Sequence, residues 1–543
     1  MLQWSIMPLP AVSPSPHIPP SARQEPRPPG DASPPGDGRP RRVAILGGGI
    51  SGLAAAHRLR ELDPAAEITL FEASDRLGGV LQTDRSRDGW LIERSADMFT
   101  TREPWALDLC RRIGIADELI ETDRRFRRAY VVRRGRLVPV PEGFTLMSPA
   151  RVWPIIKTPL LSPLGKLRLA WEYFVAAKQD DADESLESFV VRRFGREAFD
   201  RLVQPLIGGI YTADPAKLSV QATLPQFLEL ERKYGSLIRG MRSQGSGFRV
   251  QGSGDRGQES GARYGLFVAP QGGMQRLVEA IAARLPPEVV RLSAIVERIV
   301  GPACRAGPES PTDRSNAGPG PARQAGPTSS AWSVLVQGAS QPEPFDDLIL
   351  ATPGTVSSRL LRGVDHQLAD LISRVSYAGC SVAILGIGRD QLAKPLNGFG
   401  FVVPAIEKRQ IIAGSLASLK FPGRAPEGKL LLRVFVGGAL QPDLVQLAEG
   451  EIRQIVLREL NELLGLSGEP EFFEVARWLG MMPQYHVGHL DLVRQIGDRA
   501  GAIPNFALAG NAYRGVGVPF CVRSGEQAAE RVVKAPTSGR GES

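Results

Sequence analysis

Residues 41–56 read RRVAILGGGISGLAAA, and this stretch decides the fold. Its first six residues end in a continuous apolar run of small and branched side chains, which is typical of a strand buried in a parallel sheet. Gly47, Gly49 and Gly52 then match Gly-x-Gly-x-x-Gly, and the Ala-rich residues that follow predict a helix. The glycines make the tight turn, let the backbone approach a pyrophosphate, and let helix and strand pack closely. The N–H groups at the start of the helix then face the anion.

A second strand supports this interpretation. Residues 68–71 read ITLF and lead into Glu72, at the distance beyond Gly52 where a dinucleotide-binding fold carries its acid. A carboxylate there can accept from both hydroxyls of an adenosine ribose and disfavours a 2′-phosphate. A surface turn with a solvated Glu72 is the alternative, and the strand–turn–helix–strand order argues against it.

The residues after Glu72 separate two kinds of dinucleotide. Residues 72–79 read EASDRLGG, and the two terminal glycines permit a second close approach of the backbone to a ligand. This arrangement resembles the flavin amine oxidase and desaturase superfamily, in which the Arg-x-Gly-Gly element lies along FAD. The resemblance implies that FAD is bound by Gly47, Gly49, Ile50, Ser51, Gly52, Glu72, Ala73, Arg76, Gly78, Gly79, Val296, Gly510, Gly517 and Val518.

Later segments occur in the order of that superfamily. Residues 290–299 resemble the segment whose backbone meets the adenine, and residues 347–353 (DLILATP) resemble the strand that returns the chain to the FAD domain. Near the C-terminus, Ser524 and Gly525 predict the opening of a helix over residues 526–533. Its N-terminal dipole would face the flavin pyrimidine, where negative charge gathers on reduction.

Within the superfamily the chain resembles the protoporphyrinogen oxidases, including bacterial forms that act on coproporphyrinogen. The resemblance runs from about Arg42 to Val533 and is carried by segments such as PLIGGIY at 205–211, GFG at 398–400 and MPQY at 482–485. It implies oxidation of a porphyrinogen to a porphyrin in heme biosynthesis, with hydride passing from a meso carbon to flavin N5 and O2 or another acceptor reoxidising the flavin. Such chemistry needs positioning more than a strong base, so no catalytic acid or base is assigned.

The resemblance also names substrate-binding candidates. Phe399, Gly400 and Val402 match the apolar stretch that sandwiches the macrocycle, and their alternative role is strand core. Arg102 is the candidate that grips a propionate, because a guanidinium binds a carboxylate bidentately; a solvated surface arginine is the alternative. Two departures from the family pattern stand out, Ser95-Ala96 in place of Gly-Pro and Phe520 in place of an aspartate.

Composition limits the domain organisation. The chain has 543 residues, but 12 of its 45 prolines fall in the first 40. Dividing the length by roughly 150 residues per domain therefore overestimates the number of folded domains. We expect an α/β fold with a discontinuous Rossmann-like FAD-binding domain (41–110, 263–300, 331–360 and 481–535), an α+β substrate-binding domain (111–150 and 361–480) and an inserted mainly helical domain (151–242). A disordered Pro-rich leader (1–40), a flexible loop (243–262), a disordered insertion (301–330) and a tail (536–543) complete the chain.

Charge and cysteine usage exclude several function classes. The net charge is +8, but much of it lies in seven arginines between residues 124 and 136, whereas nucleic-acid binding needs a distributed basic face. We therefore expect no nucleic-acid partner and interpret the arginines as exposed strand and loop charge. The four cysteines are far apart and the five histidines scattered, so neither a metal site nor a disulfide framework is expected.

Residues 151–169 mix apolar side chains with Lys157, Lys166 and Arg168, which is typical of a helical surface lying on a membrane or packed against a neighbour. We expect a cytoplasmic protein, with peripheral attachment to the inner membrane face as an option, and a homodimer or a ferrochelatase-type enzyme among its partners. Another flavin oxidase, of an amine or a carotenoid, is the alternative function. Amine oxidases often carry an acid where Asn511 stands, which favours a porphyrinogen. A non-catalytic FAD or tetrapyrrole carrier is a second alternative.

Overall fold

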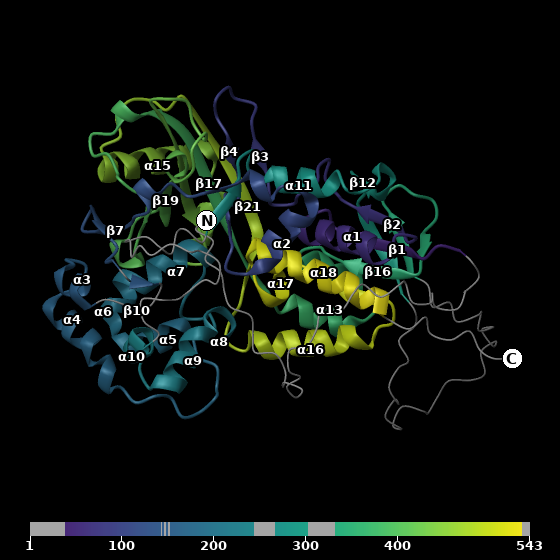
Figure 1. Cartoon of the computed structure of the whole chain (residues 1–543), viewed down its shortest axis with the longest axis horizontal. Helices are drawn as coiled ribbons and strands as arrows, with labels where there is room; N and C mark the ends of the chain where they lie inside the picture. The colour runs from purple at the N-terminus through teal and green to yellow at the C-terminus, as the bar shows by residue number, and fades with distance from the viewer. Residues whose placement is uncertain are drawn as a thin grey trace, which may run out of the picture.

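The computed structural model describes residues 39–142, 144–145, 148–149, 152–243, 267–301 and 332–534. The leader, the flexible loop, the disordered insertion and the tail expected from the sequence fall almost entirely outside these ranges. In Figure 1 a helical region lies at the lower left, a large sheet above it, and a smaller helix-covered sheet at the right. The expected mixed α/β architecture is confirmed.

A five-stranded parallel sheet is built around the strand that opens the sequence motif. Its order is β12-β2-β1-β16-β22, and every neighbouring pair is parallel. The chain moves outward from β1 on one side and returns on the other, so the carboxyl end of β1 is a topological switch point, where such sheets bind ligands. The strands are β1 (Arg42–Leu46), β2 (Glu67–Phe71), β12 (Val290–Arg291), β16 (Asp347–Leu350) and β22 (Phe506–Leu508).

Two helices, α1 (Ile50–Leu62) and α18 (Val518–Lys534), pack closely against each other over this sheet. The prediction that the last helix opens at residue 526 is wrong, because α18 begins at Val518. Ser524 and Gly525 lie inside it. A Cβ on Gly525 would come 2.0 Å from the Ser51 carbonyl oxygen, so this glycine serves helix–helix contact and not a helix start.

Further elements complete this unit. A three-stranded antiparallel sheet joins β13, β14 and β15, and a second one joins β5, β11 and β6. The strands are β5 (Phe99–Thr100), β6 (Leu119–Glu121), β11 (Phe267–Pro270), β13 (Val296–Val300), β14 (Trp332–Val336) and β15 (Glu343–Phe345), with a β3–β4 hairpin (Thr83–Asp84, Ile92–Glu93). The helices are α2 (Pro104–Ile113), α11 (Gln275–Ala282), α12 (Gly354–Leu361), α13 (His366–Ser373), α16 (His489–Ala502) and α17 (Asn511–Arg514).

The large sheet has seven strands in the order β21-β17-β20-β19-β18-β7-β8. Val402 points to the face shared with the helical region, whereas Phe401 points to the opposite face, which α15 (Glu449–Leu464) covers. The strands are β7 (Ala129–Arg133), β8 (Arg136–Pro139), β17 (Ser376–Gly388), β18 (Gly400–Val402), β19 (Ala413–Leu416), β20 (Lys429–Gly437) and β21 (Phe472–Gln484), and α14 (Ala417–Lys420) links β19 to β20.

The helical region lies between the first and second parts of the parallel-sheet unit in sequence. It includes the turn η3 (Trp171–Phe174) and a π-helical turn η4 (Phe199–Val203). Its helices are α3 (Val152–Lys157), α4 (Pro163–Ala170), α5 (Leu186–Phe194), α6 (Arg196–Ala198), α7 (Gln204–Tyr211), α8 (Val220–Thr223), α9 (Pro225–Tyr234) and α10 (Leu237–Ser243), with a short hairpin β9 (Phe144–Thr145) and β10 (Ser148–Pro149) before them.

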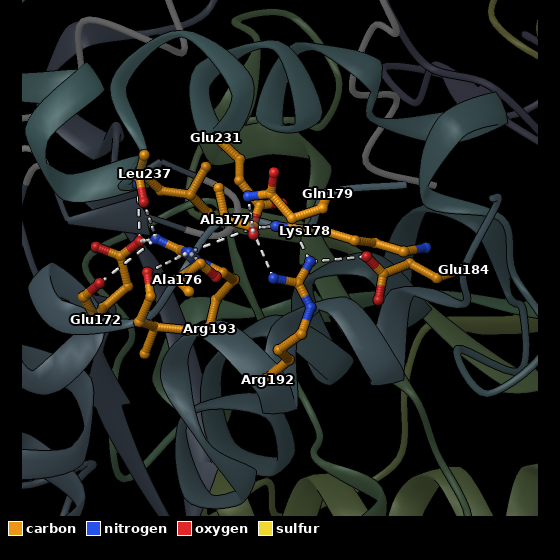
Figure 2. A network of polar contacts seen from close by, with 12 residues as sticks. Glu172, Ala176, Ala177, Lys178, Gln179, Glu184, Arg192, Arg193, Glu231 and Leu237 are labelled. Carbon is orange, nitrogen blue, oxygen red and sulfur yellow. Dashed lines mark hydrogen bonds and ion pairs between the residues drawn. The ribbon is translucent and has the colours of Figure 1, made fainter. Parts of the chain in front are cut away.

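A buried ion network holds this region together (Figure 2). Glu172 and Arg193 are fully buried and form a salt bridge, and the Arg193 guanidinium also contacts Glu231 at 3.2 Å. The Glu172 carboxylate accepts from the Ser236 hydroxyl and, at 2.8 Å, from the Leu237 N–H that opens α10. The network therefore joins η3, α5, α9 and α10 through charge-assisted hydrogen bonds.

Replacing Arg193 tests this network. Arg193→Ala leaves the buried Glu172 carboxylate without a cation, whereas Glu231 keeps its ion pair with Arg192, and we expect a loss of about 3–5 kcal/mol of unfolding free energy. Arg232→Ala is the matched control, because it removes an exposed ion pair with Asp181 and should cost less than about 1 kcal/mol. Urea denaturation followed by circular dichroism measures both; equal losses in the two variants would contradict the assignment.

Candidate functional site

Two glycine-rich turns lie side by side at the carboxyl end of β1. Gly78 N–H donates to the Gly48 carbonyl at 2.9 Å, and Gly49 and Gly78 form a parallel bridge. Gly47 and Gly78 have φ of +108° and +107°, which side chains rarely adopt. A Cβ on Gly52 would lie 1.9 Å from the Gly47 carbonyl oxygen, so only a glycine lets α1 pack this closely against the turn after β1.

Gly49 has a different role from these packed glycines. It stands at the N-cap of α1 with φ of −70°, and a Cβ built on it meets nothing within 4 Å. Open space therefore lies in front of the first turn of α1, whose N–H groups have no partner within the helix. A glycine with room in front of it at a helix N-terminus fits a pyrophosphate, whose approach a side chain would block.

Glu72 is held at the carboxyl end of β2. Its Oε2 accepts from the Gly48 N–H at 2.7 Å, and its Oε1 accepts from the Ser74 N–H at 2.9 Å and the Ser74 hydroxyl at 2.7 Å. Its main chain bonds to Arg291 and Ala294, just before Val296 opens β13. A carboxylate offers about four lone-pair positions, so the group keeps capacity for a ribose hydroxyl. Ala73 follows it in the same turn.

Arg76 organises the second glycine turn. Its guanidinium donates to the carbonyls of Gly79 at 2.6 Å, and of Leu77 and Leu81 at 3.2 Å. The side chain thus closes the loop that carries Gly78 and Gly79. Its role is to shape the backbone that lies beside the dinucleotide-binding turn.

The start of α18 reaches the same edge of the sheet. Ala509 N–H bonds to the Leu350 carbonyl, Gly510 N–H to the Ser524 hydroxyl at 3.0 Å, and the helix then begins at Val518 directly after Gly517. The first N–H groups of a helix have no partner within it, so they form a positive pole. Two helix N-termini, a carboxylate and two glycine turns therefore converge, although the sequence separates them widely. This set fits FAD.

The substrate-binding candidates lie on β18 and just before it. Gly400 has φ of +153°, and a Cβ on it would lie 2.1 Å from the Gly414 carbonyl of β19, so strand pairing requires a glycine. Val402 is fully buried, and Phe399 packs in a small cluster with Met98 and Phe267. These are the contacts of strand core, the alternative role. Contact with a macrocycle stays a prediction.

Arg102 lies between β5 and α2. Its N–H donates to the Thr100 hydroxyl at 3.2 Å, and burial lowers the pKa of its guanidinium. Nearby, the Trp105 ring of α2 meets the Phe520 ring edge-on at 5.3 Å. Phe520, which stands where the family usually has an aspartate, therefore packs against Trp105 at the start of α18. Propionate binding by Arg102 stays a prediction.

Sequence reasoning missed a buried charge group between the parallel-sheet unit and the seven-stranded sheet. Lys420 Nζ lies 2.7 Å and Arg433 3.0 Å from Asp97 Oδ2, and Arg433 also donates to the Ser95 carbonyl. Burial would raise the pKa of Asp97, but the two cations hold it well below its usual range. Only folding brings these residues together, so no sequence pattern could have revealed the group.

Tyr211 OH, Gln484 Oε1 and Ser415 Oγ are among the buried polar atoms that have no hydrogen-bond partner within the residues that the structure describes. Gln484 Nε2 donates to the Tyr211 carbonyl at 3.3 Å, so two of these residues are neighbours. Burial raises the pKa of Tyr211, which keeps its hydroxyl neutral. Buried acceptors without donors indicate a place for a ligand that supplies them. The segments at residues 205–211 and 482–485 carry the family resemblance in the sequence, but no sequence pattern predicts that Tyr211 and Gln484 offer buried acceptors to a ligand.

Gly49→Val tests the dinucleotide turn. Because a side chain at this position meets open space, the variant should fold but bind no FAD. Gly497→Val is the matched control, since a Cβ there also meets nothing within 4 Å but lies on α16. The flavin absorbance of the purified proteins measures loading; a fully yellow Gly49→Val protein would show that the turn does not hold the cofactor.

Glu72→Ala tests the ribose contact. Losing charge-assisted hydrogen bonds of about 1.5–3 kcal/mol should raise the FAD dissociation constant at least tenfold. Glu67→Ala, at the exposed start of the same strand, should leave it unchanged. Titration of apoprotein with FAD, followed by quenching of flavin fluorescence, gives both constants. An unaltered constant for Glu72→Ala would remove the carboxylate from the binding site.

Comparisons with known proteins agree with this geometry. The family model described as flavin containing amine oxidoreductase matches residues 50–533. The coproporphyrinogen III oxidase of Bacillus subtilis is 34% identical, with 90% of this chain and 97% of the relative covered. The mitochondrial protoporphyrinogen oxidase of Nicotiana tabacum is 29% identical, with 91% and 95% covered.

Solved structures share the architecture. A crystal structure assigned as a protoporphyrinogen oxidase, from Exiguobacterium sp. 255-15, aligns with a TM-score of 0.75 at 28% identity and covers 91% of this chain and 98% of its own. Cyclohexylamine oxidase from Brevibacterium oxydans, at 15% identity and a TM-score of 0.63, shares the fold. The chain therefore belongs to the flavin-containing amine oxidoreductase family, in the group that includes the coproporphyrinogen III and protoporphyrinogen oxidases.

Proposed function

We propose that this chain oxidises a porphyrinogen to a porphyrin in heme biosynthesis, with coproporphyrinogen III as its substrate and O2 as electron acceptor. The relatives named coproporphyrinogen III oxidase, in Bacillus subtilis and Staphylococcus aureus, are 34% and 30% identical to it over most of both chains. One structural observation carries the choice of substrate. The arginine-rich segment at residues 124–136 includes β7, which pairs in parallel with β18, the strand of the substrate candidates.

FAD bound in this site would accept one hydride from a meso carbon in each cycle while a proton leaves the macrocycle, and three such cycles, each followed by reoxidation by O2, would complete the six-electron oxidation. The residues of the chain then have to orient the macrocycle and keep water away. The pyrrole N–H groups of such a ligand need acceptors, and the buried Tyr211 hydroxyl oxygen and Gln484 Oε1 supply two of them in this proposal. Val402 and Phe399 would exclude water from the reacting face. No general base is required at the reacting carbon.

Arg128 lies beside β18, the strand of the substrate candidates. Its carbonyl accepts from the Phe399 N–H at 2.8 Å, Ala129 is the register partner of Gly400, and its own side chain is exposed. Coproporphyrinogen carries four propionates, whereas protoporphyrinogen carries two propionates and two vinyl groups. A cation at this edge favours the more acidic substrate, because an arginine binds carboxylates through strong charge-assisted bonds.

A comparison of the two substrates tests the proposal. We expect kcat/KM for coproporphyrinogen III to exceed that for protoporphyrinogen IX at least tenfold, measured by porphyrin fluorescence in air. Arg128→Gln should raise KM for coproporphyrinogen about tenfold through loss of a charged hydrogen bond, with kcat little changed. Arg125→Gln is the matched control, since Arg125 is exposed and already paired with Asp123.

Anaerobic mixing separates the alternatives. Bleaching of the flavin by porphyrinogen but not by amines supports the proposal, and the converse identifies an amine oxidase. Porphyrin formed over many turnovers excludes a carrier. Equal kcat/KM values for the two porphyrinogens, unaffected by Arg128→Gln, would overturn the choice of coproporphyrinogen while leaving porphyrinogen oxidation in place.

We also propose that the chain is cytoplasmic and docks on the inner membrane face. Among the described residues no helix is long and apolar enough to cross a bilayer. Large apolar side chains nevertheless stay exposed on α3, α4 and η3, next to Lys157 and Lys166. Aromatic and aliphatic groups beside lysines suit an anionic lipid surface. The exposed side chains are Trp153, Ile156, Leu164, Leu167, Trp171 and Phe174.

Vesicle flotation checks the docking surface. The wild-type protein should float with phosphatidylglycerol-containing vesicles, and Trp171→Glu with Phe174→Glu should abolish flotation without loss of turnover. Leu479→Glu, at an exposed apolar position on β21, is the matched control and should float normally. Absence of wild-type flotation, together with a dimer in light scattering that the double variant disrupts, would assign the surface to a second copy.

A further inference from the structure

Tyr485 lies where the three regions of the molecule meet. It follows β21 directly, and its carbonyl accepts from the Ser219 N–H of the helical region at 2.8 Å. Its ring is buried and stacks on His489 of α16, with centroids 4.0 Å apart and planes at 14°. A side chain in this position can transmit the placement of one region to another.

The hydroxyl of Tyr485 is inserted into a turn of helix. Gly515 N–H donates to it at 2.7 Å, and the hydroxyl in turn donates to the Asn511 carbonyl. In an uninterrupted α-helix, Gly515 N–H would bond directly to that carbonyl, its i−4 partner. A side chain that enters this ladder bends or ends the helix. Accordingly α17 stops at Arg514, and Gly515 has φ of +138°.

The interruption sets where the next helix begins. Because α17 ends, α18 starts afresh at Val518, and its first N–H groups are left for a ligand. Phe520 supports the bend, since a Cβ on Gly515 would come 2.4 Å from its ring. His489 supports it from the other side: its Nε2 lies 3.1 Å from the Tyr513 carbonyl, and burial lowers its pKa to about 4, so the neutral ring donates there.

We propose that Tyr485 is a positioning residue for the bound flavin. Its hydroxyl holds the break between α17 and α18, and thereby directs the N-terminal pole of α18 at the flavin pyrimidine. That pole stabilises the negative charge of reduced flavin more than it stabilises the neutral oxidised form. The proposal goes beyond the porphyrinogen assignment, because it applies to any substrate oxidised at this site.

Tyr485→Phe tests it while keeping the ring and its stack. Without the hydroxyl, Gly515 N–H can bond directly to Asn511, and the pole of α18 moves. We expect reduced FAD to bind about tenfold more weakly relative to oxidised FAD, because the displaced pole stabilises the negative charge less. Such a ratio lowers the two-electron midpoint potential by about 30 mV, measured by equilibration with a reference dye.

Two further variants keep the test decisive. Tyr377→Phe is the matched control, since it removes a hydroxyl that accepts from the Gly354 N–H at 2.8 Å, at the start of α12, and should leave the potential unchanged. His489→Phe loosens the same bend at Tyr513 and should lower the potential less than Tyr485→Phe does. The proposal would be overturned if Tyr485→Phe and His489→Phe both left the midpoint potential unaltered. It would also be overturned if Tyr377→Phe lowered the potential as much as Tyr485→Phe does. Loss of coproporphyrinogen preference together with the expected fall in potential would concern the proposed substrate only.

Discussion

Close backbone packing at the first turn of α1 is the constraint on which the structure depends. The Gly47 carbonyl packs directly against the Cα of Gly52, and the Ser51 carbonyl packs in the same way against Gly525 of α18. Any side chain at either position would push a helix away. Since both contacts hold, α1 and α18 direct their N-termini to one edge of the parallel sheet, and their dipoles add there.

The other regions are held against that edge by buried polar groups. Asp97 with Lys420 and Arg433 joins the parallel-sheet unit to the seven-stranded sheet, and Tyr485 joins the turn between α17 and α18 to the helical region through Ser219. Removing one partner from a buried ion group is costly, so such groups favour one relative placement of the regions. The orphaned acceptors of Tyr211 and Gln484 lie close to these junctions.

Much of the FAD-binding unit could be predicted because its signals are local. A strand, a glycine turn and a helix follow one another within residues 41–56, and Glu72 comes at the expected distance. The start of the last helix was predicted wrongly for a physical reason: Gly525 looks like a helix breaker in the sequence, but it lies inside α18 where it lets α1 approach. Propensity describes an isolated segment, whereas packing decides whether a glycine ends a helix or permits contact.

By itself the sequence determined the α/β class, the dinucleotide turn and the family, because these depend on residues that are close in the chain or occur in a characteristic order. Only the tertiary structure decided how Lys420 meets Asp97, which acceptors lack donors, and how the Tyr485 hydroxyl interrupts α17. Those contacts join residues far apart in sequence. Their geometry comes from the relative placement of three regions, and no local pattern records that placement.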